Sequence, residues 1–244
     1  MRLADALMLA PALGTGVDWK SGDAIADLSS PVMTGVQQLY LPMEATTRYA
    51  GQNRDQDAWL PNGNIQAVDG GTLAADANAY LLLSKQTNGL LSNHAHHLIC
   101  EGKSLHWGHA ISLARPSSTI NYFRIGSAGC DVRYSDRLLD LSQTVWGDYA
   151  TDGINIASWR FEASGSSMRL TMFVNGQKGS TSPFVYVGNL SAYPPLNLAF
   201  NAMQRNTLES GSANSKLLGY FRTSSGLSDA EILAFHADIN GALQ

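Results

Sequence analysis

The stretch Met168-Arg-Leu-Thr-Met-Phe-Val-Asn-Gly176 decides the fold of this chain. Apolar side chains stand at every second position from Met168 to Val174, with arginine, threonine and phenylalanine between them. That period of two is typical of a β-strand, whose successive side chains point to opposite faces of a sheet. Asn175-Gly176 follows at once, and this dipeptide readily adopts the positive φ angles of a tight hairpin turn. The stretch therefore predicts a strand that ends in a hairpin.

The strand pattern extends to both sides of this stretch. Upstream, Glu162-Ala-Ser-Gly-Ser-Ser167 is a polar turn that joins it to an earlier strand containing Trp159. The chain continues to alternate short apolar runs with turns, and long helical periodicity is almost absent. The predicted strands are 36–41, 79–84, 97–101, 104–113, 120–125, 131–134, 154–163, 168–175, 184–187, 196–202 and 217–222. Many short strands favour a sandwich or barrel over alternating βαβ units.

The carboxyl end carries the one helical signal. Ser228-Asp-Ala-Glu231 is a capping box, in which the serine hydroxyl and the glutamate carboxylate satisfy each other's backbone amides. Asn240-Gly241 supplies a stop. The residues that mark one helical face between these signals are Ile232, Phe235, His236 and Ile239. We expect one short amphipathic helix that closes an all-β domain.

The amino-terminal part is punctuated by glycine and proline. We assign residues 1–75 to an arm or a set of added strands, and residues 76–244 to the sandwich domain. Asp5 interrupts the apolar run that begins at Met1, so we expect no export signal. No apolar stretch approaches the ~20 residues that span a bilayer.

Composition and charge narrow the classes of molecule that this chain is expected to bind. Of 244 residues 44% are hydrophobic and 15% charged, and 16 basic against 20 acidic side chains leave a net charge of −4. No lysine or arginine run forms a phosphate-binding footprint, so we expect no nucleic-acid partner. Cys100 and Cys130 are expected to be buried thiols, and a single bridge between them is the alternative.

Four short motifs follow one another along the chain. They are Met172-Phe-Val-Asn-Gly176, Leu196-Asn-Leu-Ala-Phe200, Leu218-Gly-Tyr-Phe-Arg222 and Leu227-Ser-Asp-Ala-Glu-Ile232. Together they resemble the carboxyl half of a concanavalin A-like (laminin G-like) jelly roll, over about residues 154–235. The resemblance implies a jelly-roll sandwich with one short carboxyl-terminal helix and an irregular amino-terminal segment.

The chain departs from that family at one place. Tyr220-Phe221 stands where the family carries an acidic pair, so residues that help hold calcium or saccharide near that strand are not carried over. Similar domains occur in lectins, glycan-binding modules, retaining endoglucanases and structural proteins of bacterial viruses. Fold alone does not choose among these functions.

We expect no enzyme. Retaining glycosidases of this fold need two carboxylates about 5–5.5 Å apart on one strand face. No glutamate in a predicted strand has another carboxylate two or four residues away. No G-x-S-x-G nucleophile elbow is present either.

Histidines and aspartates are the candidate metal ligands. In a strand, His94 and His96 share one face, and His106 on a paired strand would complete a three-imidazole zinc site, which Cys100 could join. Asp148 and Asp152 could hold calcium in a loop, as could Asp55-Gln-Asp57. The alternatives, which we favour, are hydrogen-bonded strand or turn histidines and solvated loop acids, with no cofactor.

Three tryptophans near turn signals are the candidate sugar-stacking residues: Trp59, Trp107 and Trp146. An indole face offers apolar area and one donor, which suits sugar rings as well as protein interfaces. Trp159 lies inside a predicted strand, and we expect it in the core.

Three functions remain. The first is a structural protein of a virus particle, a bacteriophage tail or capsid-surface component located in the virion. It would contact other copies of itself and neighbouring virion proteins, and would contribute to host-surface glycan attachment. The missing catalytic set, the missing export signal and the Gly/Pro-rich start favour it. The second is a free carbohydrate-binding lectin or module, and the third a hydrolase whose carboxylates converge from distant strands.

Overall fold

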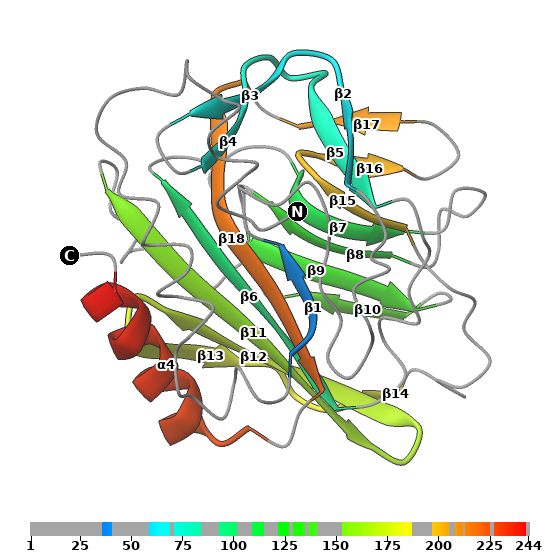
Figure 1. Ribbon diagram of the computed structural model, residues 1–244. Coiled ribbons are helices and arrows are strands. Elements are labelled where there is room, and N and C mark those ends of the chain that lie inside the picture. The colour runs from blue at the N-terminus through cyan, green and yellow to red at the C-terminus, as the bar shows by residue number, and fades with distance from the viewer. Residues whose placement is uncertain are drawn as a thin grey trace.

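The protein is described here by a computed structural model. The described residues are 36–40, 59–68, 71–83, 93–101, 109–114, 122–126, 129–134, 137–140, 153–186, 197–204, 208–211, 213–224 and 227–242. Within these ranges the chain forms two large β-sheets and one helix (Figure 1). The prediction of an all-β sandwich with one carboxyl-terminal helix is confirmed.

The first sheet contains nine of the described strands. Its order is β13-β12-β11-β6-β18-β4-β3, with β1 also beside β18 and β14 also beside β12. The strands are β1 (Val36–Tyr40), β3 (Ile65–Val68), β4 (Gly71–Ala74), β6 (His94–Glu101), β11 (Ile154–Ser164), β12 (Ser167–Val174), β13 (Gln177–Thr181), β14 (Val185–Tyr186) and β18 (Ser215–Ser224).

The second sheet has the order β10-β9-β8-β7-β15-β5-β2, and β16 and β17 form a separate two-stranded ribbon. The strands are β2 (Trp59–Asn62), β5 (Tyr80–Leu83), β7 (His109–Ala114), β8 (Tyr122–Gly126), β9 (Gly129–Tyr134), β10 (Arg137–Asp140), β15 (Asn197–Phe200), β16 (Ala202–Gln204) and β17 (Leu208–Ser210). Every strand pair in the described part of the chain is antiparallel, as in a sandwich built from hairpins and longer crossovers.

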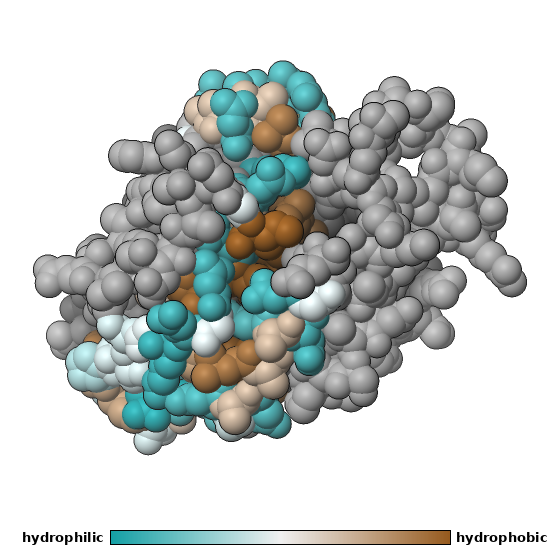
Figure 2. Space-filling view, turned by 90° about the vertical axis from the view of Figure 1, so that its left-hand side faces the viewer, coloured by the Kyte–Doolittle hydropathy of each residue, from teal (hydrophilic) through white to brown (hydrophobic). Residues whose placement is uncertain are grey.

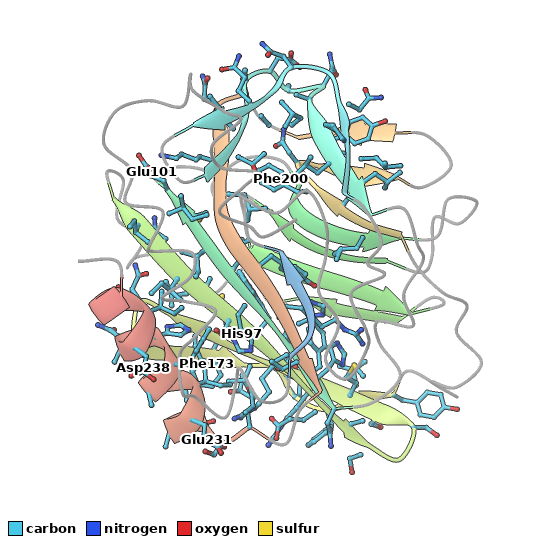
Figure 3. The ribbon with its side chains drawn as sticks, viewed as in Figure 1. His97, Glu101, Phe173, Phe200, Glu231 and Asp238 are labelled. Atoms are coloured by element: carbon cyan, nitrogen blue, oxygen red, sulfur yellow. The ribbon has the colours of Figure 1, made fainter. Side chains whose placement is uncertain are left out.

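The two faces of the first sheet have different neighbours. Helix α4 (Asp229–Ala242) covers the outer face, where His97 and Phe173 lie beneath it (Figures 1 and 3). The opposite face points toward the second sheet. Its side chains form the core, and the largest of them, Trp159, Tyr220 and Phe161, are fully buried. The prediction that Trp159 belongs to the core is confirmed.

Local sequence signals place the β11–β12–β13 meander and the helix. Asn175 and Gly176 adopt φ angles of 47° and 79°, the positive values that the hairpin turn requires. Ser228 and Glu231 form the expected capping box, in which the Glu231 amide donates to the Ser228 hydroxyl over 3.2 Å. The four residues of the predicted helical face are all buried: Ile232, Phe235, His236 and Ile239.

The described residues before position 76 form strands in both sheets: β1, β3 and β4 in the first and β2 in the second. These described residues add strands to both sheets, and the expectation for the rest of residues 1–75 stays a prediction. The division at residue 75 stays a prediction. Among the described residues, the single helix is too short to cross a bilayer.

Cys100 is a free, buried thiol, as expected, and burial raises its pKa. The alternative of a bridge from Cys100 to Cys130 is therefore wrong.

Candidate functional site

The outer face of the first sheet continues beyond the start of helix α4. Glu162 on β11 stands opposite Arg169 on β12, on the same face as Ser158 beneath the helix. The Arg169 guanidinium donates to both Glu162 oxygens, from Nε over 2.8 Å and from Nη2 over 2.9 Å. This bidentate pair is partly exposed, so solvent and a ligand can reach it.

Two exposed aromatic side chains lie beside this pair. Tyr186 stands opposite Ser167, and continuing that register places Phe184 next to Arg169. The Arg169 guanidinium lies 4.8 Å from the centre of the Phe184 ring, a cation–π contact. The exposed fractions are 45% for Phe184 and 62% for Tyr186, which make them unusual for large apolar residues. We name Glu162, Arg169, Phe184 and Tyr186 the outer-face patch.

The charges of the outer-face patch are fixed by their partners. The hydrogen bond from Arg169, with the charges of Arg160 and Arg169, lowers the pKa of Glu162 against the opposing effect of burial. Glu162 is therefore a carboxylate at neutral pH. It accepts hydrogen bonds, while the guanidinium beside it donates them.

A chain of ion pairs connects the patch to the helix. Arg160 Nη2 lies 3.4 Å from Glu162 Oε2, and Arg160 Nη1 lies 2.6 Å from Oδ1 of Asp229, the first residue of α4. The other oxygen of Asp229 accepts from Lys178 Nζ over 2.6 Å. The hydrogen bond from Lys178 is the main cause that lowers the pKa of Asp229.

The arrangement suits a ligand with an apolar face and a polar edge. Aromatic rings offer flat apolar area, whereas the carboxylate and guanidinium give a few oriented acceptors and donors. Figure 2 shows the side of the molecule on which α4 lies, with hydrophilic residues over much of its lower part and hydrophobic residues above them. No reacting group is required for such recognition.

The predicted zinc ligands His94 and His96 share one face of β6, as the strand parity requires. That face is interior: the exposed fractions are 1% for His94 and 0% for His96. The His94 ring stacks on Phe161 at 4.5 Å, and His96 Nδ1 lies 2.8 Å from the Tyr220 hydroxyl. Burial, followed by the charges of His94, Arg222 and His97, lowers the pKa of His96.

These contacts show two histidines packed into the core of the sandwich. Groups of three metal-ligating side chains are absent from the described part of the chain. His106 lies outside it, so the three-imidazole site stays a prediction. Asp148, Asp152 and the pair Asp55 and Asp57 also lie outside the described residues, and the calcium site remains untested.

Of the three candidate tryptophans the structure describes Trp59, which lies away from the outer-face patch in the second sheet. Trp59 begins β2, the edge strand of the second sheet, where it pairs with Leu83. Trp107 and Trp146 lie outside the described residues. Sugar stacking by these tryptophans stays a prediction.

Sequence reasoning missed the outer-face patch. Residues 184–187 are a predicted strand, but their apolar residues alone do not reveal that Phe184 and Tyr186 are exposed. The available signal was Pro183, which favours a sheet edge where one side of the strand meets solvent.

Comparisons with known proteins bear on the fold. No family model matches the sequence, and no curated protein matches it either. The CBM40 module of the Ruminococcus gnavus IT-sialidase is similar in structure, with a TM-score of 0.53 and 16% identity over 67% of this chain and 95% of that module. The same module bound to α2,3-sialyllactose gives a TM-score of 0.52.

A second neighbour is the binding domain of botulinum neurotoxin serotype C1. Its TM-score is 0.57 at 8% identity, and the match covers 84% of this chain but 52% of that one. The chain shares a lectin-like β-sandwich fold with these proteins.

Proposed function

We propose that this protein is a non-catalytic carbohydrate-binding β-sandwich that recognises glycans at its outer-face patch. The observation that carries the proposal is the exposure of Phe184 and Tyr186 beside the Glu162–Arg169 pair. A pyranose ring has an apolar C–H face that can stack on an aromatic ring, and hydroxyls that pair with a carboxylate and a guanidinium.

The fold supports the proposal. The CBM40 neighbour was solved with α2,3-sialyllactose, so a sandwich of this architecture can present a glycan site.

The virion interpretation is a second proposal with weaker support. None of the neighbours named above is a virion protein, and the Gly/Pro-rich start on which it rests lies mostly outside the described residues. Attachment of a virus particle to a host glycan would use the same patch. Assembly with virion proteins, self-association and location in a virion all remain untested.

The first experiment is a glycan array, run with calcium and again with EDTA, followed by titration of the best ligand. α2,3-Sialyllactose and lactose serve as the charged and neutral starting probes. We expect specific binding that survives EDTA, because the outer-face patch holds its polar groups without a metal. Specific binding lost in EDTA would move the site to the loop acids, and no binding at all would refute the proposal.

Tyr186→Ala should weaken that binding about 5- to 30-fold, because truncating an aromatic anchor costs about 1–2 kcal/mol. Leu60→Ala is the matched control. Leu60 is also an exposed apolar residue, at 50% against 62% for Tyr186, but it lies on β2 at the edge of the other sheet. Equal effects of the two substitutions would show that the patch is not the site.

A further inference from the structure

A continuous hydrogen-bond chain fastens helix α4 to the first sheet. The Gly176 amide donates to His236 Nδ1 over 3.0 Å, so that nitrogen carries no proton. The neutral ring then carries its proton on Nε2, which lies 2.7 Å from the Ser158 hydroxyl oxygen. The Ser158 hydroxyl is left to donate to His97 Nδ1 over 2.7 Å. His97 Nε2 completes the chain toward the Thr223 hydroxyl at 3.3 Å.

This chain works only while His236 is neutral. A second proton would have to sit on Nδ1, where it would face the Gly176 N–H, and two donors cannot bond each other. Gly176 lies at an exposed turn, but His236 and Ser158 are fully buried, so the second N–H of a protonated His236 ring would face a donor without an acceptor of its own. Protonation is thus incompatible with the docked helix but compatible with a released one.

The surroundings of His236 offer no compensating charge. Ser158 on β11, His97 on β6, the Gly176 amide and Phe235 of the helix are uncharged. The charged side chains on the elements packed around it are Arg160 and Glu162 (β11), Arg169 (β12), Lys178 (β13), Glu101 (β6), Lys216 and Arg222 (β18), and Asp229, Glu231 and Asp238 (α4). Asp229 pairs with Arg160 and Lys178, Glu231 with Ser228, and Asp238 is exposed. None of the ion pairs in the described part of the chain includes His236.

Burial accordingly lowers the pKa of His236 to about 4. A histidine that water reaches has a pKa near 6.5. Between these two values a released helix binds a proton that the docked helix does not, so acid favours release.

The helix also holds the outer-face patch. Asp229 fixes Arg160, which lies next to Glu162, and Glu162 orients Arg169 over Phe184. When Asp229 leaves with the helix, Arg160 loses that carboxylate partner and competes with Arg169 for Glu162. The guanidinium that lies over Phe184 then loses its fixed position.

We propose that helix α4 is an acid-released latch: a proton gained by His236 frees the helix from the first sheet and, through Asp229, loosens the outer-face patch. The release step stands on the contacts of the helix alone. The second step rests on the proposed function, because it makes glycan binding weaker in acid.

Hydrogen exchange of the α4 amides, corrected for the intrinsic rate at each pH, tests the latch in the full chain without any glycan. We expect the protection of α4 relative to β6 and β11 to fall about 10-fold per pH unit below 6.5, reaching about 30-fold at pH 5. His236→Gln retains a neutral side chain there and should abolish this dependence. Asp238→Asn, an exposed change on the same helix, should leave it intact.

Two results would overturn the latch: α4 protection that follows the sheet at every pH, or the same pH dependence in His236→Gln. Should that variant fail to fold, the imidazole resonances of the wild-type protein decide. We expect that His236 does not take up a proton near pH 6.5 as long as α4 stays protected from exchange. Titration of His236 near pH 6.5 in a protein whose α4 is still protected would refute the latch.

The same ligand titrated at pH 7 and pH 5 tests the second step. We expect its affinity to fall together with α4 protection in the wild type and to stay constant in His236→Gln. Unchanged affinity while α4 is released would overturn the coupling. Absence of binding at every pH would refute the proposed function, and the exchange data would still decide the latch.

Discussion

Ser158 has one hydroxyl and serves two imidazole rings. It accepts from His236 and donates to His97, at 2.7 Å in each case, and all three side chains are fully buried. Burial and the charge of His236 lower the pKa of His97 to about 3, so its ring is neutral at neutral pH as well. A buried serine between two histidines connects the helix to the sheet through hydrogen bonds and does not act as a nucleophile, because no substrate can reach it.

Ser158→Ala should lower the free energy of unfolding by about 2–4 kcal/mol, because it leaves a buried acceptor on His97 and a buried donor on His236. Urea denaturation at neutral pH measures the change. Ser164→Ala, at an exposed position on the same strand, should stay within about 0.5 kcal/mol. An effect of Ser158→Ala as small as that of Ser164→Ala would contradict the hydrogen-bond chain.

Substitution of a single residue, Asn175, tests the account of the hairpin turn between β12 and β13. Its φ of 47° disfavours residues with an ordinary side chain, and its side-chain oxygen Oδ1 accepts from the Ile156 N–H over 2.9 Å. Asn175→Ala should therefore destabilise the protein by about 1–3 kcal/mol. Asn175→Gly should cost less, because glycine tolerates the positive φ although it also lacks the side-chain hydrogen bond. Thermal unfolding of both variants gives the order, and a more stable alanine variant would contradict this account.

At the scale of elements, α4 depends on both its packed face and its cap. Four buried side chains hold the helix to the sheet, and the full burial of an apolar side chain stabilises a fold by about 1.5–3 kcal/mol. The cap fixes the residue at which the helix begins. The Ser228 hydroxyl accepts from the Glu231 amide, and the Glu231 carboxylate accepts from the Ser228 amide over 2.6 Å. Asp229 directly follows the capping residue Ser228, so the cap places the first residue of the helix beside its ion-pair partner Arg160.

Ser228→Ala should cost about 1 kcal/mol of stability, the usual value of a lost N-cap. Amide exchange in the first turn of α4 should rise more than exchange in its last turn. Ser228→Asp, which keeps a capping oxygen, should restore most of the loss. An alanine variant as stable as the wild type would show that packing alone fixes the start of the helix.

The whole molecule should lose stability in mild acid. His236 has a pKa of about 4 when folded and near 6.5 when unfolded, so the unfolded chain binds more protons between those values. The contribution of His236 to the free energy of unfolding is complete above pH 6.5. It decreases as the pH falls, and the loss reaches about 2 kcal/mol at pH 5. Urea midpoints at pH 7.5 and 5.0 should differ accordingly, and unchanged midpoints would contradict the neutral, buried ring.

Local patterns were enough to predict several elements of this fold. Alternation from Met168 to Val174 and the Asn175-Gly176 turn predicted β12 and its hairpin, and the capping box predicted α4. These signals lie within a few residues of each other, where backbone geometry dictates the spacing.

The sites depend on pairings between distant residues. Ser158 meets His97 and His236 across 61 and 78 positions, and Arg169 meets Phe184 only because β14 returns along β12. Parity placed His94 and His96 on one face but could not tell that this face is interior. Which face a strand buries is decided by the layer packed on it, and no short window of sequence contains that layer.

The most direct test of glycan recognition at the outer-face patch is a nuclear magnetic resonance titration of the full chain with the best array ligand. We predict saturable shifts of the amides of residues 162–169 and 184–186, with little change in the second sheet. Shifts confined to other parts of the molecule, or no saturable shift with any glycan, would contradict the proposed function.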